Sequence, residues 1–192
     1  MPRAIAGPLS GAAMRADPND YLQTAAAIAA DLRALGLSPV LVGGMALVVL
    51  GSRRVTHDFD FVVAHPGDRL EQALDALYTR GLELVSRLDD AGDVVATIDN
   101  KSVAAARLRI DKPASAYFYN AGTGLRVDLL FDFPIEAAAL DARATKTRIQ
   151  SHRFAIASDE DLLTLKRIAA AARSVSGDAQ DIAFLESRIM AR

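Results

Sequence analysis

Two aspartates, Asp58 and Asp60, lie one residue apart in the segment "GSRRVTHDFDF" (51–61). In a β-strand side chains alternate between faces, so both carboxylates point one way while Phe59 and Phe61 point into the core. Two neighbouring carboxylates repel each other, and a bound divalent cation relieves that repulsion. Oxygen ligands without cysteine or clustered histidine favour Mg²⁺ or Mn²⁺ over zinc. An isolated D-x-D pair is more often a pair of solvent-facing residues, so the surrounding sequence decides.

The segments on either side of this pair could complete a site. Upstream, "LVGGMAL" (41–47) predicts a strand, a turn at Gly43 and Gly44, and a short helix whose first N–H groups can hold phosphate oxygens. Glycine allows this approach because it has no Cβ. Downstream, "LRVDLLFDF" (125–133) alternates as a strand that presents Arg126, Asp128 and Asp132 on one face. Asp128 is therefore a candidate third carboxylate.

The remaining pattern predicts an α/β fold, with a mixed β-sheet flanked by helices and a helical C-terminal part. Helical spacing is found at 18–35 and 69–81, and "SPVLV" and "DFDFVV" are typical of strands. The region 82–134 predicts further strands, in "GLELVS", "VVATI", "AARLRI", "SAYFYN" and "GLRVDLLFDF". A basic loop is expected around His152. We predict a flexible N-terminal tail (1–17), a core (18–157) and a helical pair packed on that core (158–192).

Composition excludes several classes of protein. The chain has 192 residues, of which 51% are hydrophobic, and this length favours a single domain. The formal net charge is -2, so no global positive field indicates a nucleic-acid partner. There is no cysteine, which fits a cytoplasmic location. The most apolar stretch, 39–51, is shorter than the roughly 20 residues that span a bilayer, so no membrane partner is expected.

The combined motifs resemble the nucleotidyltransferase superfamily related to DNA polymerase beta, and within it the AbiEii-like enzymes of type IV toxin–antitoxin systems and their relatives. "VGGMAL" followed by Arg54, Thr56, Asp58 and Asp60 matches the family pattern position by position. Near the C-terminus, "LLTLKRIAAAARSVSGDAQDIAFL" matches with Lys166, Arg173, Asp178 and Asp181. The spacing after Arg173 is one residue longer than the pattern, and Gly177 stands where a lysine is usual. The resemblance covers about residues 42–185.

This resemblance implies a metal-dependent enzyme that moves a nucleoside monophosphate from a nucleoside triphosphate to a hydroxyl acceptor. Asp58, Asp60 and Asp128 would bind Mg²⁺ or Mn²⁺, and Asp128 would act as the general base. The residues expected to bind the nucleotide are Gly43, Gly44, Arg53, Arg54, Thr56 and Lys166. Arg173 lies two helical turns beyond Lys166 and is a further candidate. Asp178 and Asp181 are also candidates, although helix capping would explain them equally well.

The acceptor is less well defined by the sequence. Four cations, Arg143, Lys146, Arg148 and Arg153, lie in a segment without acidic residues (142–158) that could follow an RNA backbone, although a solvated basic face is commoner. Resemblance to the toxin branch implies a tRNA acceptor and a cognate antitoxin. One alternative is an antibiotic nucleotidyltransferase of the aminoglycoside or lincosamide type, with an acidic, aromatic-lined pocket in the C-terminal part. Another is a non-catalytic nucleotide-binding regulator on the same fold.

Overall fold

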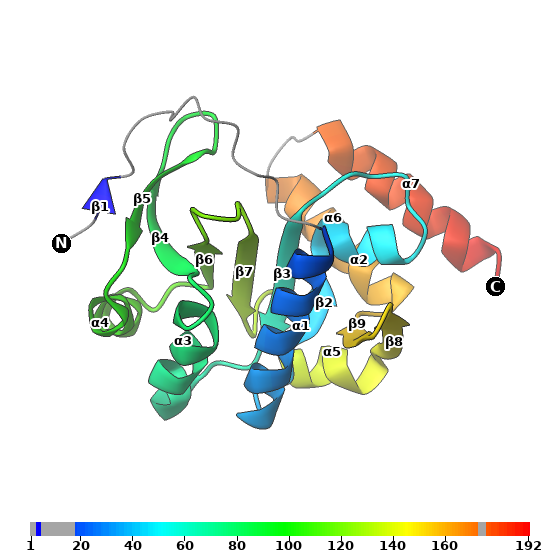
Figure 1. Cartoon of the computed structure of the whole chain (residues 1–192). Helices are drawn as coiled ribbons and strands as arrows, with labels where there is room; N and C mark the ends of the chain where they lie inside the picture. The colour runs from blue at the N-terminus through cyan, green and yellow to red at the C-terminus, as the bar shows by residue number, and fades with distance from the viewer. Residues whose placement is uncertain (1–2, 5–17, 173–175) are drawn as a thin grey trace.

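A computed structural model describes residues 3–4, 18–172 and 176–192 (Figure 1). The α-helices are α1 (Pro18–Ala34), α2 (Gly43–Val49), α3 (Leu70–Tyr78), α4 (Lys101–Asp111), α5 (Ala137–Arg143), α6 (Asp159–Ala172) and α7 (Ser176–Met190), with a 3₁₀ turn at Gly67–Arg69. The strands are β1 (Arg3–Ala4), β2 (Val40–Val42), β3 (Asp58–Val63), β4 (Glu83–Leu88), β5 (Val94–Ile98), β6 (Ser115–Tyr119), β7 (Arg126–Phe131), β8 (Thr145–Ile149) and β9 (His152–Ile156). Apart from β1, which pairs with β5, the predicted N-terminal tail lies outside the described residues.

The described strands form one mixed sheet in the order β1-β5-β4-β6-β7-β3-β2-β9-β8. Strand β3 lies near its centre, parallel to β7 on one side and antiparallel to β2 on the other. Strand β9 runs parallel to β2, and the remaining pairs are antiparallel. Because β3 and β7 are neighbours, the two aspartate-bearing segments of the sequence meet in the middle of the sheet.

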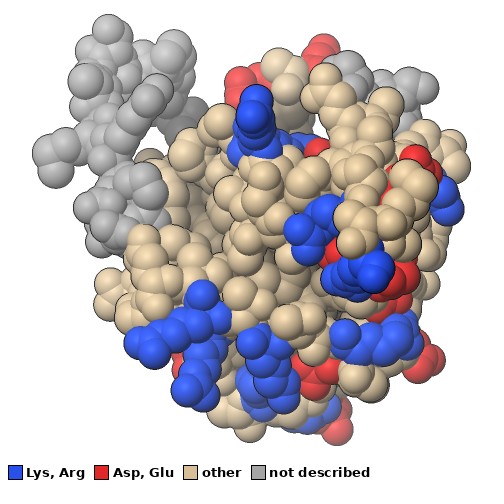
Figure 2. Space-filling model, turned by 90° about the vertical axis from the view of Figure 1, so that its right-hand side faces the viewer, with Lys and Arg blue, Asp and Glu red and all other residues tan. Residues whose placement is uncertain are grey.

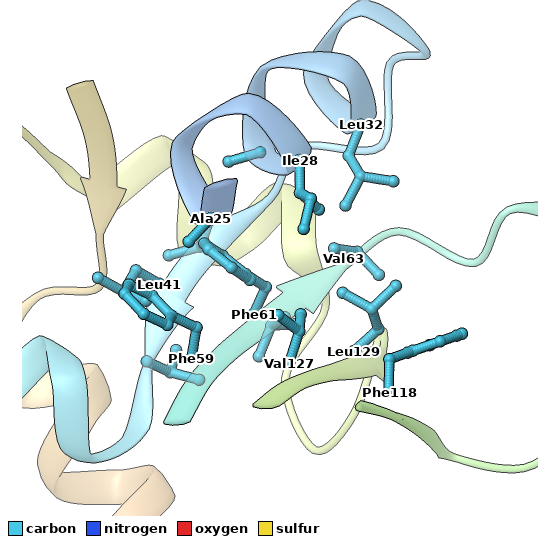
Figure 3. Close-up of a cluster of buried hydrophobic side chains, with 14 of the residues drawn as sticks. Ala25, Ile28, Leu32, Leu41, Phe59, Phe61, Val63, Phe118, Val127 and Leu129 are labelled. Atoms are coloured by element: carbon cyan, nitrogen blue, oxygen red, sulfur yellow. The ribbon is translucent and has the colours of Figure 1, made fainter. Parts of the chain in front are cut away.

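The hydrophobic core lies between this sheet and helix α1. Ala25, Ile28 and Leu32 of α1 face Phe59 and Phe61 of β3 across the layer (Figure 3). The two rings stack with centroids 6.4 Å apart, and each lies 6.5 Å from the ring of Phe154 on β9. Full burial of each such side chain stabilises the fold by about 1.5–3 kcal/mol. Because side chains alternate along β3, Asp58 and Asp60 point to the opposite face of the sheet, where they are only partly buried.

Two predicted features differ from the observed elements. Residues 105–110, "AARLRI", belong to helix α4 and not to a strand. Asn100 caps this helix by accepting a hydrogen bond from the Val103 N–H at 3.1 Å, and Ala104 and Leu108 bury one helical face. The expected basic loop around His152 is instead the β8–β9 hairpin at the edge of the sheet.

Helices α6 and α7 pack against each other and against the core (Figure 1). The Asp161 N–H donates to Ser158 Oγ at 3.1 Å, which caps the start of α6. Arg188 of α7 donates through Nη1 to the carbonyl oxygen of Leu50 at 2.9 Å. The C-terminal helices are thereby tied to the loop that follows α2. Among the described residues no helix combines the length and apolar character needed to cross a membrane.

Candidate active site

The three candidate carboxylates lie on one face of the sheet. Asp60 on β3 is the register partner of Asp128 on β7, and Asp58 is the partner of Arg126. Adjacent strands are separated by about 4.8 Å, and residues two apart along a strand by about 6.6 Å. Register partners point to the same side, so Asp58, Asp60 and Asp128 form a compact group of negative charge. The local cause is the strict alternation of both strands, whose other face is apolar core.

The electrostatic surroundings of Asp128 strongly perturb its carboxyl group. Burial, together with the negative charges of Asp60 and Asp58, raises its pKa from 3.8 to about 7. Its Oδ1 atom is buried, and no described residue donates a hydrogen bond to it. A buried carboxylate oxygen without a donor is costly in an apolar surrounding. Asp128 therefore sits where either a proton or a cation would relieve the strain.

These residues suit a hard divalent cation by their chemistry. Three carboxylates on one face, one with an oxygen that lacks a donor, are the ligand type that Mg²⁺ and Mn²⁺ prefer. With the side chains as they stand, no three acidic, histidine or cysteine groups of the described residues converge on one metal-binding point. The strand register nevertheless brings the Cα atoms of Asp60 and Asp128 together on adjacent strands.

The Gly43–Gly44 turn packs directly against this group. Gly43 has φ = +67°, and a Cβ there would lie 1.9 Å from Asp60 Oδ2. A Cβ on Gly44 would lie 2.9 Å from Arg54 Nε and 3.3 Å from Thr56 Cγ2. The turn thus needs glycine for its conformation at the first position and for close approach at both. It holds the strand–helix junction against Asp60 on one side and Arg54 on the other.

The segment between α2 and β3 contributes the remaining nucleotide-site candidates. Thr56 Oγ1 accepts a hydrogen bond from the Asp58 N–H at 3.3 Å, so this hydroxyl braces the start of β3. Ser52 Oγ accepts from the Arg54 N–H at 3.3 Å. Arg53 and Arg54 are both exposed, and the Arg54 side chain turns back toward Gly44 and the C-terminal helices.

Arg54 belongs to an ion network that joins this segment to α6 and α7. Its Nη1 atom lies 2.5 Å from Asp181 Oδ2, and the Lys166 Nζ atom lies 2.6 Å from the same oxygen. Lys166 also lies 3.4 Å from Asp178 Oδ1. Lys166, Asp178 and Asp181 are all less than 10% exposed. Two cations and two carboxylates therefore balance in a cluster that is buried except for Arg54, and helix capping alone would not require this arrangement. Arg173 lies outside the described residues.

Three polar residues share the carboxylate face but were not among the sequence candidates for a role. Tyr117 on β6 is the register partner of Asp128, and Tyr119 is the partner of Arg126. Burial raises the pKa of Tyr117, whereas nearby Arg126 lowers it. The Arg126 guanidinium lies 5.9 Å from the Tyr119 ring centroid and 3.6 Å from Asp93. Alternation in "SAYFY" and "LRVDLL" could have placed these three residues on one face of each strand. It could not have shown that the two faces adjoin, because that requires knowing that β6 and β7 are neighbours.

The four basic candidates do not form one group with the carboxylates. Arg143 makes a bidentate ion pair with Asp161 at the start of α6, with distances of 2.9 and 2.7 Å. Lys146, Arg148 and Arg153 lie on the β8–β9 hairpin, at the sheet edge. Asp132, which the alternation placed beside Asp128, accepts hydrogen bonds from the N–H groups of His65 and Ala137 at the end of β7. It therefore closes a turn and lies apart from the site.

Comparison with known proteins supports the fold. No family model matches the chain, and no curated protein is similar to it in sequence. Among solved structures, the antibiotic-resistance factor ANT(2'')-Ia in solution superposes with a TM-score of 0.57 at 12% identity, over 90% of this chain and 86% of that one. Its crystal structure with adenylyl-2''-tobramycin gives 0.56 at 13%, over 88% and 90%.

A third structure, an antigenic nucleotidyltransferase-like protein from Paracoccidioides brasiliensis, gives a TM-score of 0.53 at 17% identity, over 87% of this chain and 75% of that one. Likeness at such low identity establishes the architecture and not the activity. The chain has the nucleotidyltransferase fold, as the sequence predicted.

Proposed function

We propose that this protein is a nucleotidyltransferase that moves a nucleoside monophosphate from a nucleoside triphosphate to a hydroxyl acceptor. The observation that carries the proposal is the register of Asp60 with Asp128, which sets three carboxylates together on the face beside the Gly43–Gly44 turn. Solved structures of nucleotidyltransferases share this fold. Within this class of enzyme we propose AbiEii-like nucleotidyltransferases as relatives, and the support for this is the sequence motifs around Arg54 and Lys166.

Asp58, Asp60 and Asp128 would hold Mg²⁺ or Mn²⁺. When bound, the metal would supply charge stabilisation for the attacking and leaving oxygens of the transferred phosphoryl group. The chain itself contributes three carboxylates on one face of the sheet, whose mutual repulsion a cation would relieve. The carboxylates are also partly buried. Because burial excludes water, it strengthens their electrostatic interactions with a cation.

Asp128 would also accept the proton from the attacking hydroxyl. In the metal-free protein, burial and the negative charges of Asp60 and Asp58 raise the pKa of Asp128 to about 7. A bound cation would lower this pKa, so the carboxylate would be ionised and able to accept the proton. The proton would move from the acceptor oxygen to this carboxylate as the bond to the α-phosphorus forms and the bond to pyrophosphate breaks.

The triphosphate would lie on the side of the Gly43–Gly44 turn. Glycine lets backbone N–H groups approach phosphate oxygens closely. Arg54 is 37% exposed at its side chain and therefore accessible to a phosphate, while Asp181 holds its orientation. Arg53 and Thr56 lie in the same segment. Lys166, whose charge Asp178 and Asp181 balance, would support Arg54 through their shared partner Asp181. Charge-assisted contacts from Arg54 would stabilise the leaving pyrophosphate.

The acceptor we favour is RNA, in particular tRNA, with a cognate antitoxin as a protein partner. Support comes from the motif resemblance and from the basic β8–β9 hairpin, which carries Lys146, Arg148 and Arg153. Arg143 contributes less to this support because Asp161 already neutralises it.

A small polycationic, hydroxylated acceptor is the second candidate. Tyr117 lies beside Asp128, and Asp93 lies 3.6 Å from Arg126, so aromatic and acidic groups adjoin the carboxylates from β5, β6 and their connections. ANT(2'')-Ia, which shares the fold, has been solved with an adenylylated tobramycin. This arrangement differs from the C-terminal pocket expected from the sequence, because the aromatic residues lie on the sheet.

Transfer of label from α-labelled ATP, CTP, GTP or UTP tests both candidates. Purified protein would be given Mg²⁺ or Mn²⁺ together with total RNA, or with a panel of aminoglycosides and lincosamides. Label in RNA that disappears in Asp58→Asn and Asp60→Asn supports the first candidate, and label in a drug supports the second. Tight nucleotide binding without transfer to any acceptor would favour a non-catalytic regulator.

A further inference from the structure

Strand β8 forms one edge of the described sheet. It pairs with β9 on one side only, whereas at the opposite edge Arg3–Ala4 of the same chain pair with β5. Thr145, Lys146 and Arg148 of β8 are exposed. The backbone of an edge strand is a template for pairing with another chain. A further extended segment could therefore be added to the sheet at β8.

The hairpin register shows which backbone groups such a segment would bind. Residues 150–151 form the turn between β8 and β9, so Ile149 and His152 flank it as directly opposed partners. In a hairpin closed by two residues this flanking pair is hydrogen-bonded, and such pairs alternate with pairs that are not. The N–H and C=O groups of Lys146 and Arg148 therefore point away from β9, toward the outer edge.

The two faces of the β8–β9 hairpin differ in character. Phe154 lies on the same face of the sheet as Phe61, with the two rings 6.5 Å apart, and Thr147 is the register partner of Phe154. Because strand residues alternate, the neighbours of these hairpin residues point to the opposite face, the face of Asp60. That face carries the three cations of the hairpin, Lys146, Arg148 and Arg153.

These cations are incompletely balanced by the protein. Figure 2 shows lysine and arginine side chains gathered along the lower part of this side of the molecule, at the level of β8 and β9 in Figure 1. Among the described residues, Lys146 and Arg153 have no ion pair or side-chain hydrogen bond, and Arg148 donates to the carbonyl oxygen of Gln150 at 3.0 Å. Carboxylates opposite Lys146 and Arg148 on an added strand would supply the missing charge.

The other face of the hairpin offers an apolar cavity. A space of about 510 Å³ lies between α1 and the hairpin, and its lining includes Phe61 and Phe154 from the sheet and Ala29 and Ala30 from α1. Thr147 also lines it, so the cavity extends to the edge strand. A residue opposite Thr147 on an added strand would share its face and lie beside this cavity. An apolar side chain suits that position.

We propose that β8 is a docking edge for an extended segment of a protein partner in which acidic and apolar residues alternate. Its backbone would pair with Lys146 and Arg148, its carboxylates would face these two cations, and an apolar residue would enter the cavity beside Thr147. A second copy of this chain is a poor occupant, because antiparallel pairing of β8 with itself, faces aligned, sets cations against cations.

The bound segment would cover cations that we propose contact RNA, so the partner would block the RNA acceptor. This inhibitory role rests on the proposed function, whereas the docking does not.

Fluorescence anisotropy with a labelled peptide of about seven residues, alternating glutamate and valine, tests the docking. It should bind at least about tenfold more tightly than a peptide of the same composition with its glutamates and valines in separate blocks. A peptide that alternates glutamate with serine keeps the charges and cannot fill the cavity, so it should bind several-fold more weakly than the valine peptide.

Charge reversal tests the assigned cations. Lys146→Glu/Arg148→Glu should weaken binding of the glutamate–valine peptide about tenfold or more and should strengthen binding of a lysine–valine peptide. Arg87→Glu/Lys112→Glu, at exposed positions on β4 and after α4, gives the same change in net charge and should leave both affinities nearly unchanged. Thermal unfolding checks that both variants fold.

Amide hydrogen exchange locates the bound peptide. Exchange should slow at the Lys146 and Arg148 amides and change little at Thr147, whose N–H points toward β9. The proposal is overturned if the alternating and block peptides bind equally, if the two charge-reversal pairs have equal effects, or if exchange at Lys146 and Arg148 is unchanged. It is also overturned if the hairpin cations bind single-stranded RNA and no alternating peptide.

The two proposals can fail separately. Peptide docking at β8 together with no label transfer to any acceptor would overturn the proposed function and leave the docking edge standing. Label transfer to RNA, with no preference for the alternating peptide, would overturn this inference alone.

Discussion

Asp128 is the residue whose behaviour depends most on its surroundings. Its raised pKa means that the folded protein binds a proton more tightly than the unfolded chain does between about pH 4 and pH 7. Stability should therefore fall as the pH rises through this window. The loss amounts to a few kcal/mol, about 4 kcal/mol at 1.36 kcal/mol for each pKa unit. Above pH 7 the loss is complete.

Replacing Asp128 by Asn should remove this pH dependence. Asparagine has the same shape and no charge, so Asp128→Asn should unfold at higher urea concentration than the wild type at pH 8, with the difference shrinking toward pH 4. The measurement is urea unfolding across that range without divalent cations. Parallel stability profiles for the two proteins would show that Asp128 is not perturbed as described.

Gly43 is the residue at which the backbone of the turn packs against the Asp60 carboxylate. Ala at this position would carry a Cβ 1.9 Å from Asp60 Oδ2, so Asp60 must move. We expect Gly43→Ala to reduce nucleotidyl transfer by about 100-fold, which corresponds to roughly 2.7 kcal/mol of lost transition-state stabilisation. Gly67→Ala is the matched control, because Gly67 also has positive φ (+54°) but no atom lies within 4 Å of its added Cβ. Both should lose about 1–2 kcal/mol of stability from backbone strain.

If Gly43→Ala and Gly67→Ala reduced transfer equally, backbone strain and not displacement of Asp60 would be the cause. Comparing their activities after normalising for the folded fraction separates these effects.

At the scale of elements, the ion network is what couples α6 and α7 to the site. Asp181 on α7 holds both Arg54, from the segment after α2, and Lys166 on α6 through one carboxylate oxygen. Removing one partner from a buried ion group leaves an uncompensated charge and costs about 3–5 kcal/mol. The helical pair therefore depends on this cluster for its docking as well as on apolar contacts such as that of Leu185.

Lys166→Met should accordingly destabilise the protein by about 3 kcal/mol, measured by urea unfolding at neutral pH. Arg167→Met is its neighbour and control. Arg167 forms an exposed ion pair with Glu186 of α7 at 2.7 Å, and exposed pairs contribute at most about 1 kcal/mol. Equal effects of the two substitutions would contradict a special role for the buried network.

Elements were predictable where a local pattern dominates. The alternation of "DFDFVV" predicted which side chains of β3 are core, and the Gly-Gly turn predicted the strand–helix junction. The strand predicted at "AARLRI" was wrong. Its apolar residues fit both the strand and the helix period, and the Asn100 cap favours helix α4. Hairpin β8–β9 was missed because its strands are short and cationic, and it is stabilised by pairing with β2 and by Phe154 packing on Phe61.

At the scale of the whole molecule, the site is an outcome of strand order. Alternation placed Asp58, Asp60 and Asp128 each on a polar face, but that β3 and β7 are adjacent and in register depends on long-range pairing that no local pattern encodes. The ion partners of Asp178 and Asp181 were hidden for the same reason.

The central claim is that Asp58, Asp60 and Asp128 form a site for a divalent cation and a nucleoside triphosphate. Calorimetric titration with Mg²⁺ and a non-hydrolysable triphosphate tests it most directly, in the wild type, in Asp60→Asn, and in Asp90→Asn as an exposed acidic control. We predict saturable triphosphate binding that requires Mg²⁺, unchanged in Asp90→Asn and at least about tenfold weaker in Asp60→Asn. Metal-independent binding, or equal affinity in Asp60→Asn and the wild type, would contradict the account.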